Sequence, residues 1–197
     1  MESAGTSGER PSASQNSRSN IISIPQRALV VLSGPAGAGK STFAQRIIQK
    51  HRNQGFKPTM IVSSDRCRGL VCDDESNQQV NRDTFDLFHY IIYKRLLQNR
   101  FTIADSTALQ PEARKRLLGL AERHNYHTCL LIFDIPPEIC VQRDQQRHRL
   151  VGEQVITFHY GLLQRTIQEA PGEGWKQIHI LRYEDLPTEI AIMPDSC

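Results

Sequence analysis

One glycine-rich segment constrains the fold of this chain more than any other. It occupies residues 34–41, with the sequence Gly-Pro-Ala-Gly-Ala-Gly-Lys-Ser, and it follows the short apolar run 27–34, "RALVVLSG". Residues 40–53 come next and place Phe43 and Ile47 on one face of a predicted helix. A buried strand, a loop of small residues and a helix in this order are typical of a phosphate-binding loop.

The side chains of this loop fit that chemistry. Backbone N–H groups must point inward at phosphate oxygens, and glycine permits the dihedrals and the close approach that this requires. Lys40, expected at the solvent-facing mouth of the loop, would reach the β- and γ-phosphates, and the Ser41 hydroxyl would ligate Mg²⁺. The residues predicted to bind the nucleotide are Gly34, Pro35, Ala36, Gly37, Ala38, Gly39, Lys40, Ser41 and Thr42.

Apolar runs alternate with amphipathic stretches along the chain. Strands are predicted at 27–34, 58–65, 100–107, 127–135 and 175–182. Helices are predicted at 40–53, 84–99 and 153–168, and at two further positions that begin at Pro111 and Pro137. This pattern predicts an α/β P-loop NTPase fold, in which a five-stranded parallel sheet carries helices on both faces. Ligands of such sheets bind beyond the carboxyl ends of the strands.

Composition sets the expected domain boundaries. Residues 1–20 are rich in Ser, Gly and Asn, so 1–26 is predicted to be a disordered tail, with a regulatory or docking role left open. The kinase-like domain is expected at 27–187, and 188–197 is expected to form a short C-terminal tail.

Charge and cysteine usage exclude several classes of protein. A net charge of +3 provides no strong overall field toward nucleic acid, so any basic surface must be local. The five cysteines form no CxxC pair, which argues against a zinc site or a disulfide framework and favours a reducing, cytoplasmic compartment. No apolar run reaches 18 residues, so no membrane association is expected.

Two aspartates end predicted strands and should lie at the same sheet edge as the loop. Asp65 is followed by Arg68, whose planar guanidinium could hold an anionic group of a substrate. A kinase that acts on an alcohol needs a carboxylate to accept the hydroxyl proton, and Asp65 is the candidate. Helix capping or a turn is the alternative reading of an Asp in this position. Asp105 either holds Mg²⁺ through water or braces the loop by hydrogen bonding.

An arginine-rich segment lies in 140–155. Arg143 and Arg147 are four residues apart and would share one face of a helix, with Arg149 close behind. Between the fourth predicted strand and the last helix, such a segment can form a lid whose cations neutralise a γ-phosphate during transfer. A solvated polar helix face is the alternative.

With these motifs in place, the chain resembles the kinase domain of bacterial polynucleotide 5′-hydroxyl kinases, in the zeta and polynucleotide kinase group of P-loop phosphotransferases. The resemblance covers roughly residues 28–183. The segments that carry it are "GPAGAGKSTFA", "SSDRCR", "ADST", "EARKRLLGLAERH" and "CVQRDQQRHR".

The resemblance implies ATP and Mg²⁺ as cofactors and a role for each candidate residue. Lys40 and Ser41 would hold phosphate and magnesium, and Asp65 would be the general base for a 5′-hydroxyl of RNA or DNA. Arg68 would contact the 3′-phosphate beside the attacking nucleoside. The lid would contact the ATP phosphates through Arg143 and Arg147, whereas a third lid role for Arg149 is left open because the spacing is shifted. Larger members of the family fuse the kinase to phosphatase and adenylyltransferase modules, so separate ligase or phosphatase partners are expected for this chain.

Two other functions stay open from the sequence. One is a small-molecule kinase of the same fold that acts on a sugar acid, a nucleotide-sugar or an antibiotic alcohol. The other is a non-catalytic, ATP-dependent switch, which would need no base such as Asp65 beside an acceptor hydroxyl. Few aromatic residues and a modest charge argue against contacts with a long stretch of nucleic acid. Neither argument applies to a kinase that contacts only the terminal nucleotides.

Overall fold

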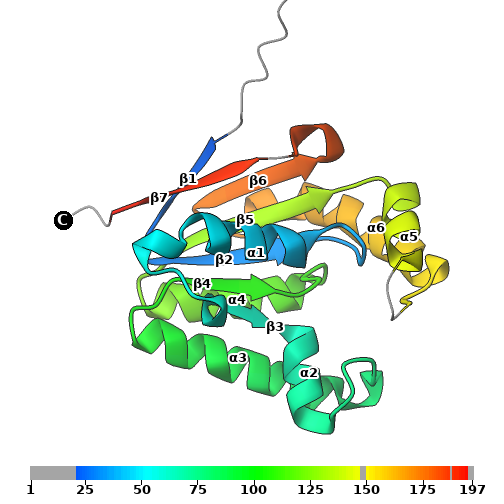
Figure 1. Ribbon diagram of the computed structural model, residues 1–197, viewed down its shortest axis with the longest axis horizontal. Coiled ribbons are helices and arrows are strands. Elements are labelled where there is room, and N and C mark those ends of the chain that lie inside the picture. The colour runs from blue at the N-terminus through cyan, green and yellow to red at the C-terminus, as the bar shows by residue number, and fades with distance from the viewer. Residues whose placement is uncertain (1–20, 147–149, 187, 195–197) are drawn as a thin grey trace, which may run out of the picture.

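The computed structural model of the chain describes residues 21–146, 150–186 and 188–194. Five parallel strands form the central sheet in the order β3-β4-β2-β5-β6 (Figure 1). Their bounds are β2 (Ala28–Ser33), β3 (Ile61–Ser63), β4 (Thr102–Asp105), β5 (His127–Asp134) and β6 (Gln177–Arg182). The predicted α/β fold with a five-stranded parallel sheet is therefore confirmed.

Helices follow the strands in the alternation that the sequence predicts. Their bounds are α1 (Lys40–Lys50), α2 (Ser64–Cys72), α3 (Asn81–Leu97), α4 (Pro111–Arg123), α5 (Pro137–Gln145) and α6 (Glu153–Glu169). Short 3₁₀ turns occupy Arg52–Gln54, Pro58–Met60, Gln78–Val80, Ala170–Gly172 and Tyr183–Asp185.

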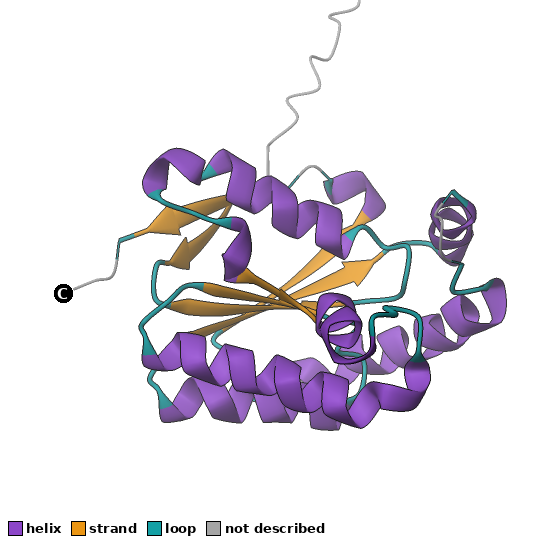
Figure 2. Cartoon of the chain, turned by 60° about the horizontal axis from the view of Figure 1, so that its bottom comes forward, coloured by secondary structure: helices purple, strands orange, loops and turns teal. Residues whose placement is uncertain are grey.

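Two apolar layers hold the helices against the sheet, because successive side chains of a strand point to opposite faces. Val30 of β2 belongs to the same buried cluster as Phe43 and Ile47 of α1. Its neighbour Val31 belongs to the cluster on the other face, which also contains Phe88 of α3 and residues of α4 and α6. Figure 2 shows the sheet nearly edge-on between these two layers of helices.

The strand order places the loop after β2 at the point where the chain reverses direction across the sheet. From β2 the chain first reaches β3 and β4 on one side and then crosses to β5 and β6 on the other. In open α/β sheets the crevice for a ligand forms at this switch point, beyond the carboxyl ends of the strands. The glycine-rich segment lies there.

Two terminal strands correct the predicted tails. β1 (Ile21–Pro25) falls inside the segment 1–26, and β7 (Glu189–Met193) inside 188–197; they pair in parallel as a separate two-stranded sheet. Ile22 and Ile190 are buried against the α1 side of the core. The Ser-, Gly- and Asn-rich composition of residues 1–20 ends before Ile21. The two strands were not predicted because each pairs with a segment at the other end of the chain.

The second predicted strand, 58–65, is also corrected. β3 covers only Ile61–Ser63, and α2 begins at Ser64 with the Ser63 hydroxyl accepting a hydrogen bond from the backbone N–H of Arg66. Asp65 therefore lies in the first turn of a helix, where its negative charge is favoured, and does not end a strand. Asp105, by contrast, ends β4 as predicted.

Across the described ranges, no helix has the length and apolar character needed to span a bilayer.

Candidate active site

The glycine-rich loop joins β2 to α1 and requires glycine at defined points. Gly37 has a φ of 80°, and a Cβ added there would lie 2.3 Å from the backbone oxygen of Cys140 in α5. Gly39 has a φ of 89° and is the N-cap of α1. Because L residues are strained in this region of φ, both positions select glycine, and the loop packs directly on the α5 backbone.

Lys40 is buried, which corrects its expected position at the solvent-facing mouth of the loop. Only 8% of it is exposed, and its Nζ donates to the carbonyl oxygens of Gly34 at 2.8 Å and Pro35 at 2.7 Å. The loop thus wraps around its own lysine. The ammonium group lines the cavity next to the loop and can contact an anion that enters it.

This first cavity, of about 340 Å³, brings together the loop and both aspartates predicted to lie beside it. Ser41 and Asp105 line it, together with Asp65 and the side chains of Ser106 and Thr107. Hydroxyl and carboxylate oxygens are the ligands that Mg²⁺ prefers, so the donor set formed by Ser41 and Asp105 fits that ion. We call this space the transfer cavity.

The strand end that carries Asp105 is tied to the loop through the backbone. The N–H of Gly34 donates to the Thr107 carbonyl at 3.0 Å, and the Ser33 hydroxyl donates to the Ala108 carbonyl at 3.1 Å. Ala108 has a φ of 42°, unusual for a residue with a side chain. These bonds hold the segment after β4 against the beginning of the glycine-rich loop.

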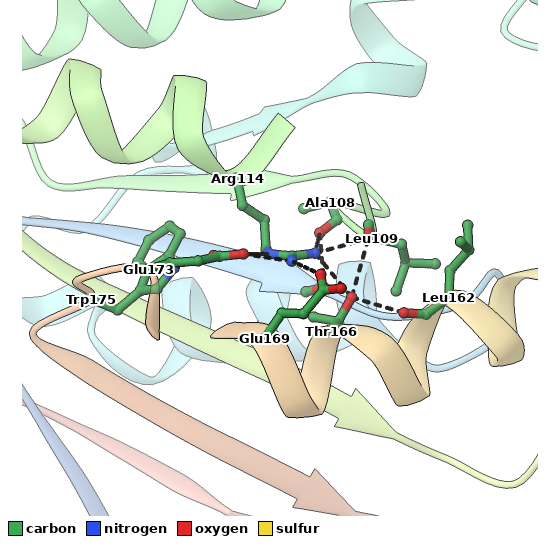
Figure 3. Close-up of polar contacts among 9 residues, drawn as sticks. Ala108, Leu109, Arg114, Leu162, Thr166, Glu169, Glu173 and Trp175 are labelled. Atoms are coloured by element: carbon green, nitrogen blue, oxygen red, sulfur yellow. Dashed lines mark hydrogen bonds and ion pairs between the residues drawn. The ribbon is translucent and has the colours of Figure 1, made fainter. Parts of the chain in front are cut away.

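A buried arginine anchors the same segment from behind. Arg114 of α4 is fully buried and donates to the Leu109 carbonyl at 2.8 Å and to the carboxylate of Glu173 at 2.6 Å, while Trp175 donates to the same carboxylate at 2.9 Å (Figure 3). Burial opposes ionisation of Glu173, but the hydrogen bonds from Arg114 and Trp175 outweigh it, and the pKa of Glu173 is lowered. Arg114 therefore connects α4, α6 and the loop that follows Asp105.

Asp65 and Arg68 form the centre of the opposite wall. Nη1 of Arg68 lies 2.6 Å from Oδ1 of Asp65, and it also donates to the carbonyl of Glu75. Nη2 donates to Asn81 at 3.1 Å, whereas Nε is buried without a hydrogen-bond partner among the described residues. The arginine thus fixes both Asp65 and the turn that leads from α2 to α3.

A second cavity, of about 500 Å³, adjoins the first at Asp65 and Ala36. Asp65 and Arg68 line it on one side, and apolar side chains of Phe85, Leu150 and Val155 contribute to its wall. We call it the acceptor cavity because Asp65 lines both it and the transfer cavity.

His159 of α6 also lines the acceptor cavity, and no local pattern in the sequence indicated it. Burial lowers the pKa of His159, and the charge of Lys40 acts in the same direction. Its Nδ1 is buried and lacks a hydrogen-bond partner within the described ranges. His159 thus adds an imidazole of lowered pKa to the wall of the acceptor cavity. Ser106 and Thr107, by contrast, directly follow Asp105 in "ADST", so the sequence could have indicated that they line the transfer cavity.

A third cavity, of about 330 Å³, lies on the other side of the loop. Ala38, Thr42 and Arg143 line it, and we call it the donor cavity. Arg143 of α5 donates to the Gly37 carbonyl at 3.4 Å, and its guanidinium lies 5.8 Å from the ring centroid of Tyr183. One predicted lid arginine is thus beside the loop.

The remaining lid candidates, Arg147 and Arg149, lie outside the described residues.

Comparison with known proteins agrees with this geometry. Residues 29–175, well over half of the chain, match the family model described as the AAA domain. No curated protein matches the chain.

Solved structures share its fold, among them the following three. A chain of the Pnkp1/Rnl/Hen1 RNA repair complex is 20% identical, with a TM-score of 0.62 over 80% of this chain and 49% of that one. A putative kinase from Chloroflexus aurantiacus J-10-fl is 14% identical, with a TM-score of 0.55 over 82% and 91%. A gluconokinase from Sinorhizobium meliloti 1021 is 14% identical, with a TM-score of 0.51 over 80% and 83%. This chain thus spans about half the length of the protein in the repair complex, and at these identities the likeness shows the fold of a P-loop kinase-like domain.

Proposed function

The chain belongs to the AAA domain family, and from that premise we propose that it transfers the γ-phosphate of ATP to a 5′-hydroxyl end of RNA or DNA. One observation carries the proposal. The carboxylate of Asp65 lines both the transfer cavity and the acceptor cavity, and the buried guanidinium of Arg68 holds it there. A general base for an acceptor hydroxyl has to occupy this position between donor phosphate and acceptor.

The donor would enter from the side of Arg143. Its nucleoside would occupy the donor cavity, and the backbone N–H groups of the glycine-rich loop with Lys40 would bind the β- and γ-phosphates. Ser41, with Asp105 directly or through water, would hold Mg²⁺. When bound, ATP supplies the phosphoryl group, and Mg²⁺ offsets part of the phosphate charge.

In the transfer step, the oxygen of the 5′-hydroxyl bonds to the γ-phosphorus, and Asp65 accepts the proton of that hydroxyl. The bond from that phosphorus to the β,γ-bridging oxygen breaks, and ADP leaves with the electron pair. Arg143, which contacts the loop at Gly37, would stabilise the charge on the transferring group, and we extend this role to Arg147. A third such role for Arg149 is left open.

In this proposal, the acceptor cavity receives the end of a polynucleotide. Its wall combines apolar side chains that suit a sugar and base with Arg68, whose guanidinium would contact the 3′-phosphate of the terminal nucleotide. A small alcohol such as a sugar acid would use the same base and is the competing acceptor. We further propose that ligase or phosphatase steps acting on the same ends belong to separate partner proteins.

The test is an acceptor panel with γ-labelled ATP and Mg²⁺. The panel contains nucleosides, nucleoside 3′-monophosphates, 5′-hydroxyl oligonucleotides and sugar acids. We expect label on the oligonucleotides and on the nucleoside 3′-monophosphates, and much less on the bare nucleosides. Label on sugar acids alone would reject the proposal, and absence of any transfer would favour a nucleotide-dependent switch.

Arg68→Ala in the same panel tests the acceptor side. It should raise KM for acceptors that carry a 3′-phosphate far more than for bare nucleosides, because only the former lose a phosphate contact. Arg66→Ala is the matched control, since Arg66 is an exposed neighbour on the same helix. Equal effects of Arg68→Ala on both acceptor classes would contradict the 3′-phosphate contact.

A further inference from the structure

A groove of about 490 Å³ lies between α3 and α4, outside the three cavities of the site. Tyr90 and Tyr93 line it from α3, and Lys115, Arg116 and Arg123 line it from α4. The two helices are joined across it by an ion pair of 3.3 Å between Arg116 and Asp86. The groove thus sets aromatic rings from one helix opposite basic side chains from the next.

A contact between two rings on α3 links the groove to the acceptor cavity. Phe85 lines the acceptor cavity, and its ring centroid lies 6.1 Å from that of His89, which lines the groove. Tyr93 follows His89 by four residues, so all three rings lie along one face of the helix. From Phe85 to Tyr93 the helix rises about 12 Å, enough for roughly three nucleotides at the spacing of a stacked strand.

The charge of the groove is positive. Three basic residues and one acidic residue line it, and the acidic one, Asp86, is paired with Arg116. Lys94 adds a fourth cation, with its Nζ 5.3 Å from the ring centroid of Tyr90 and 5.4 Å from that of Tyr93. Tyr90 is 58% exposed, so its ring is accessible from solvent. Exposed rings beside cations are the combination that binds single-stranded nucleic acid, through base stacking and phosphate contacts.

We propose that the α3–α4 groove binds the nucleotides that follow the 5′-terminal one in a single-stranded acceptor. The inference rests on the proposed function, because it extends the acceptor path from Asp65 past Phe85 into the groove. The groove would also let a chain with few aromatic residues and a small net charge bind a polymer, because three aromatic rings and four Lys or Arg side chains lie together along α3 and α4.

Gly119 offers a direct way to block the groove. It lines the groove in the middle of α4, and a Cβ added to it would meet nothing within 4 Å. Gly119→Leu therefore fills the groove without removing a charge or an aromatic ring. Gly161→Leu is the matched control, because Gly161 is a helical glycine with equally open surroundings that does not line the groove.

The first experiment measures KM for 5′-hydroxyl oligonucleotides of increasing length with the full chain. For the unaltered protein, KM should fall as the acceptor grows from one to about four nucleotides and then level off. Gly119→Leu should remove this dependence, raising KM roughly tenfold for long acceptors and leaving nucleoside 3′-monophosphates unaffected. Gly161→Leu should behave like the unaltered protein. Identical length dependence in all three proteins would overturn the proposal.

The second experiment measures binding without transfer, using a fluorescent 5′-phosphorylated single-stranded oligonucleotide at several salt concentrations. Replacing Lys115 and Arg123 together by Ala should reduce the slope of log affinity against log salt by about 1.4, since each phosphate contact to a single strand contributes about 0.7. The double variant Arg52→Ala/Arg165→Ala removes two exposed arginines elsewhere and should keep the slope. An unchanged slope in the groove variant would reject the groove as a phosphate contact.

The two experiments separate this inference from the proposed function. If oligonucleotides are phosphorylated and Gly119→Leu leaves their KM unchanged, the groove proposal is rejected and the kinase proposal stands. Groove-dependent oligonucleotide binding without any transfer would support the groove and reject the reaction.

Discussion

Arg68 and Asp65 form an ion pair of 2.6 Å in which the cation is buried and the anion is accessible. The Arg68 side chain is 4% exposed, whereas that of Asp65 is 55% exposed. A buried guanidinium has few rotamers available, and two further groups hold it besides Asp65: the Glu75 carbonyl and the Asn81 side chain. The carboxylate is therefore held in place on the wall that the transfer and acceptor cavities share.

From this arrangement we expect Asp65→Asn to lose turnover and keep the affinity for ATP. The amide can keep the shape of the side chain but cannot accept a proton, so kcat should fall by roughly 10²–10⁴-fold. Asp73→Asn is the control, because Asp73 caps the other end of the same helix. Measured ATP binding and steady-state rates decide the matter, and a fully active Asp65→Asn protein would remove Asp65 from the chemistry.

Gly37 tests the contact between the glycine-rich loop and α5. Gly37→Ala places a methyl group 2.3 Å from the Cys140 carbonyl oxygen, so the loop must move and phosphotransfer should be lost. Gly55→Ala is a matched control with a similar φ of 86° and nothing within 4 Å. It should cost only the strain of a positive φ, about 1–2 kcal/mol of unfolding free energy, with full activity. Denaturant unfolding and turnover of both variants check this. Equal behaviour would mean that backbone strain, and not the clash, matters at Gly37.

Arg143→Ala should slow transfer by weakening the stabilisation of charge beside Gly37. Cations that act in the transition state can contribute several powers of ten in rate, and less where two arginines share the role, so the double variant with Arg147→Ala should be slower still. Arg165→Ala, on the exposed side of α6, is the control. Single-turnover rates at saturating ATP make the comparison. If the double variant turned over like the unaltered protein, the arginine segment would be a solvated helix face.

Glu173 makes stability depend on pH. Its folded-state pKa is lowered, so its ionised form stabilises the fold at pH values above the ordinary value of 4.5, and that contribution is lost as the pH falls through the folded-state pKa. Glu173→Gln should therefore lower the unfolding free energy by about 1–3 kcal/mol near neutral pH and by much less in acid. Urea unfolding of both proteins, from neutral pH down into acid, measures the difference in their unfolding free energies.

Glu169→Gln is the control for that experiment, since Glu169 is half-exposed and 3.6 Å from Arg114. Its effect should stay within about 1 kcal/mol. A pH-independent loss in Glu173→Gln would show that packing, and not the charge, stabilises this cluster.

The sequence by itself determined the parts of this protein that depend on neighbouring residues. The glycine-rich loop and its lysine, the five strands of the sheet and every helix but α2 follow from local patterns, because hydrophobic period and glycine spacing act over a few residues. The placement of Asp105 beside the loop was also predictable, since parallel strands end at one sheet edge, whereas Asp65 lines the same cavity from the first turn of α2.

Only the tertiary structure decided the features that join distant segments. β1 and β7 pair although Ile22 and Ile190 are 168 residues apart in the sequence. His159 of α6 lines the acceptor cavity, and residues of α3 and α4 together line the groove. None of these has a local signal, because each side chain acquires its role from a partner far along the chain. Composition averages over the whole chain, and it therefore gave no sign that three aromatic and four basic side chains lie together along α3 and α4.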